Sequence, residues 1–124
     1  MNLKGVWENE HGSVMDITVE DGRIEGLYSS HTGETGTYRV VGLADPAPNP
    51  ETRTFAFVVC WRAIDSDEPD SLGHWVSAFV GQLQMIDGEE TLTTTWLLTK
   101  DTPPEDNWTS MLVDRSVFKR RDVG

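Results

Sequence analysis

The sequence predicts an all-β fold, an eight-stranded antiparallel up-and-down β-barrel. From residue 5 onward, short segments of alternating polar and apolar residues follow one another, separated by turn signals. Successive side chains of a strand point to opposite faces, so this alternation is typical of strands with one buried face. No stretch of the sequence has the apolar spacing of a helix of several turns. Eight sequential strands with short links favour a closed barrel, because closure removes unpaired edges.

Turn residues set the expected bounds of the strands. Asp21-Gly22 and Asp87-Gly88 are two-residue hairpin signals, and the proline-rich segment 45–50 interrupts strand pairing. The acidic segment 65–70 indicates an exposed turn, and an early proline in 103–107 allows one helical turn. In chain order the predicted strands are residues 5–9, 13–20, 23–30, 37–43, 53–62, 71–85, 91–98 and 108–119.

Length and charge limit the classes of function. A chain of 124 residues can bury one core but not two, so we expect a single domain over residues 1–124 with its core at about 5–120. The formal net charge of −11 argues against a binder of nucleic acid or of anionic membranes, because such proteins need clustered Lys and Arg. No hydrophobic run of the sequence reaches membrane-spanning length. Residues 1–4 are too few for a signal peptide, so the residues alone leave the compartment open.

One face of the predicted barrel combines large aromatic rings with small polar groups. Alternation places Trp61, Trp75 and Trp96 on the same face of consecutive strands. In the first three strands the matching face carries Trp7, Asn9, Ser13, Met15, Ile24, Gly26, Tyr28 and Ser30. Buried hydroxyl and amide groups need partners, so this mixture suits a wall that meets a partly polar guest.

Six segments of the chain resemble successive strands of the avidin and streptavidin family. They are GVWENEHGS, GLYSS, VCWRA, SLGHWVS, TTTWLLT and DNWTSMLV. The resemblance runs from residue 5 to about residue 120, and the tryptophans in the family positions are Trp61, Trp75, Trp96 and Trp108. It implies an avidin-like barrel that binds biotin tightly and without catalysis. Because members of the family are usually exported, we expect a secreted protein.

The resemblance assigns four polar residues to the ureido group of biotin. It implies that Asn9, Ser13 and Tyr28 donate to the ureido oxygen, and that Ser30 accepts from one ureido N–H. Physical chemistry supports this assignment, because buried donors aimed at one point need an acceptor there.

The resemblance also implies an aromatic box and an apolar floor. Trp61, Trp75 and Trp96 would enclose the fused rings and the alkyl chain, and Leu98 would complete the floor. By excluding water, such a box lets the polar contacts act in a low dielectric.

The resemblance also implies which residues contact the carboxylate end of biotin and how the subunits assemble. Ser71 would donate to the valeryl carboxylate, beside a lid formed by the loop 31–36. Trp108 would reach the pocket of a neighbouring subunit, which implies a homo-oligomer in which binding and assembly are coupled. A tetramer is favoured over a dimer, although Arg115 facing its own copy would repel it.

Two positions depart from the family pattern. Ser116 stands where the family commonly has Asp or Asn accepting the second ureido N–H, and this shorter group reaches the ligand only through water. Asp114 is the alternative acceptor if a bulge or a register shift brings it inward. Gly73 stands where a threonine commonly meets the thioether sulfur. Binding is therefore expected to be weaker than in the prototypes.

Other classes of function compete with this interpretation. A lipocalin-like carrier of another small apolar ligand explains the barrel but not the inward polar groups, and a pure assembly protein would have a vestigial pocket. No general base faces a nucleophile on the inner face, and His11, His31 and His74 lack the spacing of a metal site. We therefore predict no catalytic residues, no metal site and no cofactor, with biotin as a ligand only.

Three residues outside this site also carry expectations. The single cysteine, Cys60, excludes an intrachain disulfide and is by default a small buried residue, whereas alternation directs it away from the barrel. Trp7 is expected to plug one end of the barrel, packed under Arg120.

Overall fold

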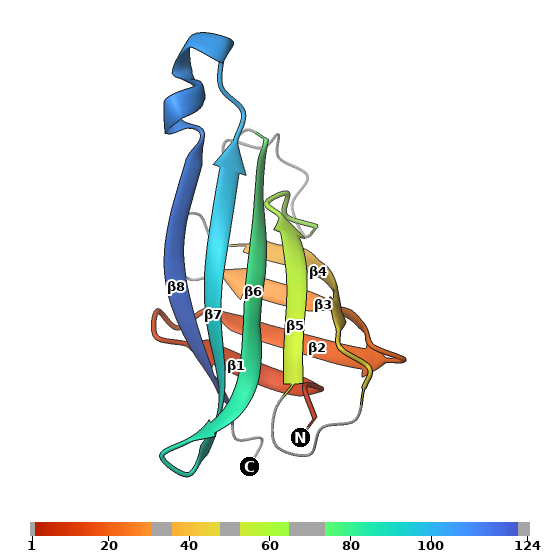
Figure 1. Cartoon of the computed structure of the whole chain (residues 1–124). Coiled ribbons are helices and arrows are strands. Elements are labelled where there is room, and N and C mark those ends of the chain that lie inside the picture. The colour runs from red at the N-terminus through yellow and green to blue at the C-terminus, as the bar shows by residue number, and fades with distance from the viewer. Residues whose placement is uncertain (1, 31–35, 48–52, 65–73, 122–124) are drawn as a thin grey trace.

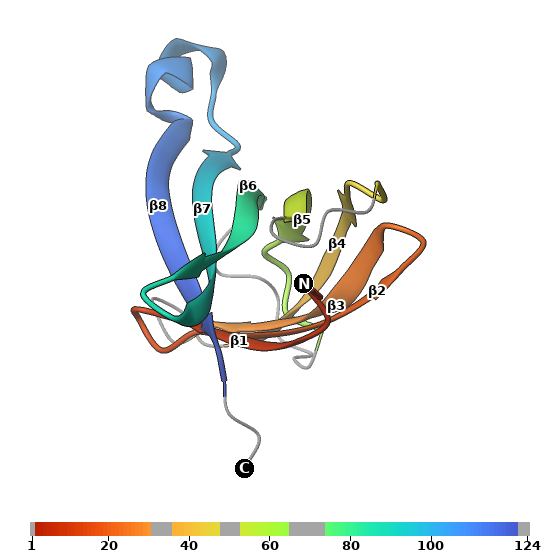
Figure 2. The ribbon, with the colours of Figure 1, turned by 60° about the horizontal axis from the view of Figure 1, so that its bottom comes forward.

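The computed structural model describes residues 2–30, 36–47, 53–64 and 74–121, and their eight strands form a closed antiparallel barrel. Each strand pairs with the next along the chain, and β8 returns to pair with β1, as Figure 2 shows where the sheet curls round on itself. The predicted fold class is therefore confirmed. The elements are β1 (Gly5–Asn9), β2 (Val14–Glu20), β3 (Arg23–Ser30), β4 (Gly36–Ala44), β5 (Arg53–Cys60), β6 (Trp75–Ile86), β7 (Glu89–Lys100), η1 (Pro104–Thr109) and β8 (Met111–Arg120) (Figure 1).

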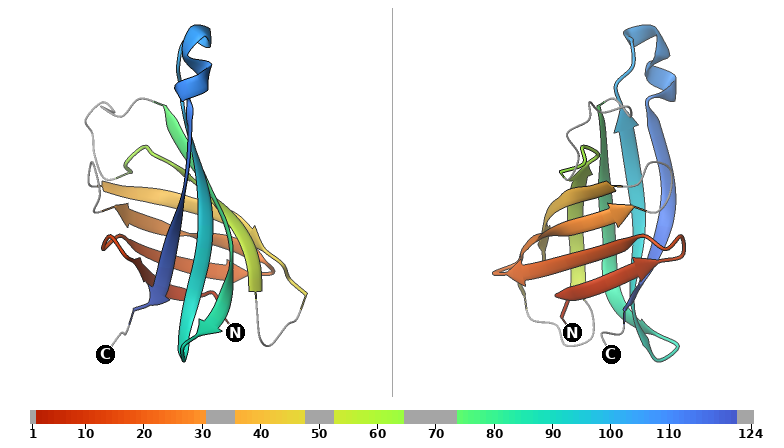
Figure 3. Two further views of the ribbon diagram at one scale, coloured as in Figure 1. Left: turned by 60° about the vertical axis from the view of Figure 1, so that its left-hand side comes forward. Right: turned by 180° about the vertical axis from the view of Figure 1, so that it is seen from behind.

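The strands begin and end close to the predicted positions. β1 and β3 have the predicted bounds, and β7 is longer than predicted at both ends. β5 ends at Cys60, so Trp61 follows the strand instead of lying within it. The predicted start of the sixth strand, residues 71–73, lies outside the described residues. Viewed from the side, β2 to β4 cross the long strands β6 to β8 at a steep angle (Figure 3).

The predicted start of the eighth strand was wrong. Trp108 lies in the 3₁₀ helix η1, and β8 begins only at Met111. Pro104 occupies the start of the helix, where its missing N–H costs nothing. The helix then runs two residues beyond the predicted turn and ends where Ser110 Oγ donates to the Asn107 carbonyl at 2.7 Å. The local hydrogen bonds of the connection thus hold Trp108 in the helix and outside the sheet.

Strand alternation produces the hydrophobic core. Phe55, Phe57 and Val59 are buried on β5, while the residues between them face outward. Phe57 stacks on Phe79 of β6 with ring centroids 4.7 Å apart. The same alternation exposes Cys60, so its predicted outward direction is confirmed and the default interpretation as a buried residue was wrong.

Inward glycines let neighbouring strands approach closely. A Cβ on Gly81 of β6 would lie 2.1 Å from the carbonyl oxygen of Thr93 on β7, and one on Gly26 of β3 would lie 2.1 Å from the Asp16 oxygen on β2. Any side chain at these two positions would push the strands apart. The glycines therefore permit the curvature that closes the barrel.

Trp7 and Arg120 close the end of the barrel near the chain termini. Trp7 is fully buried, and its Nε1 donates to the Leu3 carbonyl at 2.8 Å. The Arg120 guanidinium lies 4.2 Å from the centroid of the Trp7 ring and also donates to the Lys4 carbonyl at 2.7 Å. Arg120 Nε pairs with Glu90 at 2.6 Å. The predicted plug is confirmed, and it ties the N-terminal segment to β8.

Replacing Arg120 should destabilise the fold. Arg120→Ala removes the cation–π contact and the hydrogen bonds to Lys4 and Glu90, so we expect the free energy of unfolding to fall by about 2 kcal/mol. Urea unfolding followed by tryptophan fluorescence measures the change. Arg121→Ala, at the exposed next position, is the control and should change stability by less than about 0.5 kcal/mol. Equal effects of the two variants would contradict a structural role for Arg120.

Candidate functional site

A cavity of about 270 Å³ opens at the end of the barrel opposite the Trp7 plug. Its wall contains Ser30 at the end of β3, Tyr38 near the start of β4, Trp61 just after β5 and Trp75 at the start of β6. Ligand sites in proteins commonly enclose about 300 to 1,000 Å³. The volume of this cavity is close to the lower end of that range, which limits it to one small molecule.

The cavity brings together most of the residues predicted to bind a ligand. Those that line it are Asn9, Tyr28, Ser30, Trp61, Trp75, Trp96, Leu98 and Ser116. Ser13 lies just behind this wall, where its buried side chain forms a hydrogen bond with Tyr28. Ser71, Gly73 and residues 31–35 of the predicted lid lie outside the described residues.

The turn that follows β1 fixes the orientation of the Asn9 side chain. Asn9 Oδ1 accepts hydrogen bonds from the backbone N–H groups of His11 and Ser13, each at 3.0 Å. Because both partners are donors, this atom must be the amide oxygen. The amide nitrogen therefore lies on the other side, where Nδ2 is 3.4 Å from the Tyr28 hydroxyl. Asn9 thus presents donors to the cavity.

The Tyr28 hydroxyl is protonated at neutral pH, as a phenol ordinarily is, and can donate to a ligand. Burial raises the pKa of Tyr28 above the usual 10.0. A hydrogen bond with Ser13 opposes this increase, the nearby Glu10 carboxylate adds to it, and the hydrogen bond with Asn9 opposes it again. The direction of the pKa shift is upward, so the buried phenol holds its proton more tightly than an exposed tyrosine does. Tyr28 and Asn9 therefore form a donor cluster at one side of the cavity.

Aromatic rings form the wall of the cavity next to the donor cluster. Trp61 meets Tyr38 edge to face with centroids 4.9 Å apart, and meets Tyr28 in the same manner at 5.4 Å. Phe79 lies between this group and Trp96, with a centroid distance of 6.5 Å to the Trp96 ring. Edge-to-face contacts restrict ring orientation. The wall is therefore held in place by packing before any ligand arrives.

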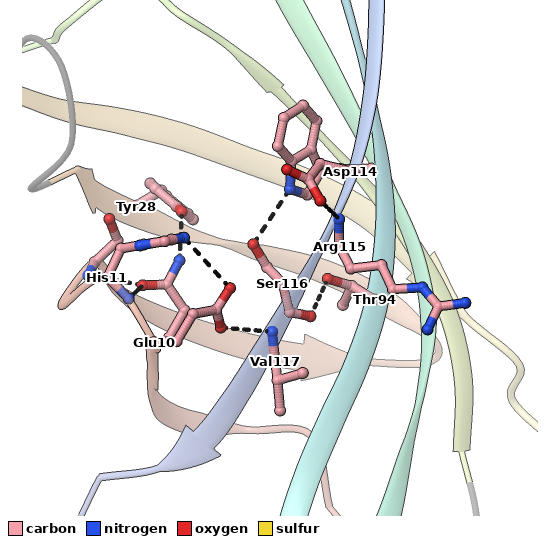
Figure 4. Close-up of polar contacts among 11 residues, drawn as sticks. Glu10, His11, Tyr28, Thr94, Asp114, Arg115, Ser116 and Val117 are labelled. Carbon is pink, nitrogen blue, oxygen red and sulfur yellow. Dashed lines mark hydrogen bonds and ion pairs between the residues drawn. The ribbon is translucent and has the colours of Figure 1, made fainter.

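Two cavity-lining serines accept hydrogen bonds from indole N–H groups. Trp61 Nε1 donates to Ser77 Oγ at 2.8 Å, and Trp96 Nε1 donates to Ser116 Oγ at 3.2 Å. The backbone carbonyl of Ser116 also accepts from Thr94 Oγ1 at 2.7 Å, as Figure 4 shows. These contacts fix the two indole rings to the neighbouring strands β6 and β8.

Charged residues surround the Ser116 side of the cavity. Asp114 and Ser116 lie on the same face of β8, opposite Trp96 and Thr94 of β7, and both line the cavity. The pairing of β7 with β8 is unbroken over these residues, so Asp114 reaches the cavity without the bulge considered above. Glu10 accepts from the Val117 backbone N–H at 2.8 Å, and its carboxylate lies 3.6 Å from Nε2 of the neighbouring His11 (Figure 4).

The prediction of the site missed several residues that line the cavity. They are His11, Tyr38, Ser77, Phe79 and Arg115. Ser77 and Phe79 lie two and four residues after Trp75, so the alternation that directs Trp75 inward also directs them inward. Tyr38 carried the same signal, because it alternates with Val40 in β4 and both are buried. His11 precedes a glycine in the turn after β1, and the sequence gave no signal that it would line the cavity.

Trp108 lies away from the cavity of its own chain. Its side chain is 83% exposed on η1, which extends beyond the end of the barrel (Figure 1). Among the residues that the structure describes, it is the most exposed of the large hydrophobic side chains. Most of the surface of the ring is therefore available for a contact outside its own barrel.

The described residues were also searched for metal sites and membrane spans. Within residues 2–30, 36–47, 53–64 and 74–121, no group of three or more His, Cys, Asp or Glu side chains is arranged to hold a metal ion. No helix in those same ranges has the length and apolar character needed to cross a membrane.

A closed eight-stranded barrel with one end plugged and a cavity of mixed aromatic and donor character defines a small-molecule-binding barrel. Comparison with known protein families identifies which family of small-molecule-binding barrels this chain belongs to. The model of the avidin family matches residues 1–121, and the chain belongs to that family. Members of the family are non-enzymatic, typically secreted β-barrels that bind biotin. The predicted resemblance is therefore confirmed.

The buried phenol of Tyr28 should make stability fall at alkaline pH. The folded chain holds the phenol proton more tightly than the unfolded chain, so the folded state binds more protons above pH 10. Its contribution to stability is intact below the unfolded pKa of about 10 and is lost as the pH rises through the folded pKa. Urea unfolding as a function of pH measures this loss. Tyr28→Phe should show a smaller decline over the same range, and an identical decline would contradict the assignment.

Proposed function

We propose that this protein binds biotin in the barrel cavity and acts by sequestration, without catalysing a reaction. The observation that supports this most directly is the donor cluster of Asn9 and Tyr28 facing the rings of Trp61 and Trp96 in one cavity. A cyclic urea fused to an apolar ring needs strong donors at one end and a dry, flat wall around the rest. The cavity offers both.

The ureido oxygen would lie against the donor cluster. Asn9 Nδ2 and the Tyr28 hydroxyl are 3.4 Å apart, close enough to converge on one acceptor, and Ser13 supports Tyr28 from behind. Donors already oriented by the protein do not have to reorganise when the ligand arrives. Ser30, which is buried in the same wall, would accept from one ureido N–H.

The tryptophans would enclose the apolar parts of biotin. Trp61, Trp75 and Trp96 line the cavity around Leu98, and Trp61 and Trp96 are anchored through their indole N–H groups. Excluding water from this space strengthens the polar contacts at the ureido end. Ser71 and the 31–36 segment would meet the carboxylate, in a part of the chain that lies mostly outside the described residues.

Ser116 limits the affinity that we expect. Its oxygen already accepts from Trp96, so only part of its acceptor capacity is left for the second ureido N–H. Asp114 provides a carboxylate nearby, but one that is exposed and accepts from the Arg115 N–H at 2.8 Å. A hydroxyl gives a weaker bond than a buried carboxylate. We therefore expect biotin to bind more weakly than in family members with Asp or Asn at this position.

The outer face of the barrel supports a homo-oligomer. Val58, Ala78, Leu97 and Val113 are register partners across β5 to β8, and three of these four side chains are among the exposed large hydrophobics. A contiguous exposed apolar row of this kind marks an interaction surface. We propose a tetramer in preference to a dimer, with Trp108 of one subunit reaching the cavity of its neighbour, in a secreted protein.

Biotin titration tests the proposal directly. Tryptophans line the cavity, so biotin should quench tryptophan fluorescence and release heat in calorimetry with a saturable signal. Tyr28→Phe keeps the ring and removes one donor, which should weaken binding by about tenfold. Thr95→Val, a comparable loss of a hydroxyl on the exposed face of β7, is the control and should bind as the unmodified protein does.

Absence of both quenching and heat at millimolar biotin would reject the proposed function. Retinoid or fatty-acid uptake without biotin uptake would instead favour the lipocalin-like carrier. Unchanged affinity in Tyr28→Phe would be consistent with biotin binding, but it would contradict a contribution of the Tyr28 hydroxyl to that binding.

Trp108→Lys should separate coupled binding and assembly from a vestigial pocket. If the ring completes a neighbour's cavity, the lysine should weaken biotin binding by about tenfold or more and also lower the oligomeric state. Calorimetry and light scattering measure the two quantities. Asn107→Lys makes the same change of charge at another exposed position of the same helix and should leave both quantities unchanged. Loss of assembly with intact affinity would indicate that Trp108 serves the interface alone.

A further inference from the structure

Ser77 carries a buried donor that the fold leaves unused. Its side chain is 1% exposed and lines the cavity, and its Oγ accepts from Trp61 Nε1 at 2.8 Å. Within the part of the chain that the structure describes, the Ser77 hydroxyl donates to no acceptor. Leaving a buried donor without an acceptor is costly, so such groups are normally paired by protein, water or ligand.

The indole fixes the role of this hydroxyl. The Trp61 N–H donates to the Ser77 oxygen, so this bond does not use the hydroxyl proton. The hydroxyl proton can therefore be donated to a ligand. Ser77 therefore offers a donor to whatever fills the cavity. Its depth limits which part of a guest can reach it, since its register partners are the fully buried Val59 and the half-buried Leu98.

Only one acceptor of biotin remains for this position. The proposed function, on which this inference rests, directs the ureido oxygen to Asn9 and Tyr28 and leaves the carboxylate at the mouth. The ring sulfur is the acceptor left for the interior. We propose that Ser77 donates a hydrogen bond to the ring heteroatom of the bound ligand, and thereby makes the cavity selective for thioether and especially S-oxidised forms of biotin.

The strength of this contact should follow the acceptor. A thioether sulfur is a weak acceptor, a sulfoxide oxygen is a strong one, and a ligand without the sulfur offers none. Ser77 should therefore contribute most to binding of biotin sulfoxide, less to biotin and nothing specific to desthiobiotin.

Calorimetric titration of these three ligands tests the assignment. We expect Ser77→Ala to lower the affinity for all three ligands. The loss should be about tenfold larger for biotin sulfoxide than for desthiobiotin, and about threefold larger for biotin than for desthiobiotin. Loss of the indole acceptor weakens all three ligands together, so the ratio between ligands isolates the contact with the heteroatom. Ser77→Cys, which keeps the size and a weak donor, should show the same order with smaller differences.

Ser116→Ala is the matched control. It too removes the acceptor of an indole N–H in the cavity, but it should weaken the three ligands by similar factors, because Ser116 is assigned to the ureido group that they share. Equal losses for the three ligands in Ser77→Ala, or no loss, would overturn the role of Ser77 while leaving biotin binding intact. Failure of the unmodified protein to bind any of the three would overturn the proposed function itself.

Discussion

The short pairing between β1 and β8 is the constraint on which the rest of the structure depends. Three residue pairs form this seam, from Trp7 with Arg120 to Asn9 with Phe118. The Arg121 N–H donates to the Val6 carbonyl beyond one end, and Glu10 accepts from Val117 beyond the other. The seam both closes the sheet and brings Asn9 to the strand that carries Ser116. Without closure, the polar wall would be divided between two unpaired edges.

The polar side of the cavity is organised from the backbone outward. In the turn after β1, two backbone N–H groups donate to the Asn9 side-chain oxygen, and the side-chain nitrogen is left to face the cavity. Indole N–H groups similarly take one of the two acceptor positions on the oxygens of Ser77 and Ser116. In Asn9, Ser77 and Ser116, hydrogen bonds within the protein therefore determine which polar atoms are left to contact a ligand. A site built in this way is rich in donors, and it favours guests that bring acceptors.

Much of the fold could be predicted because strand geometry has a period of two. Alternation identified the inner face, and turn residues such as Asp21-Gly22 located the hairpins, so β1 and β3 have the predicted bounds. The same period does not distinguish an inward residue that fills the core from one that lines a cavity, which is why Ser77 and Tyr38 were missed. The period of two also does not predict where β8 begins after the two prolines. There the hydrogen bonds of η1 keep Trp108 in the helix and outside β8.

The location of the plug has a practical consequence for handling the molecule. Arg120 donates to the Asn2 carbonyl, so the first and last described residues lie together at the plugged end, away from η1 and the cavity mouth (Figure 1). A tether attached at either terminus would hold the barrel with its opening directed outward. Immobilisation on a sensor chip or fusion to a carrier protein would thus leave the entrance accessible to solute.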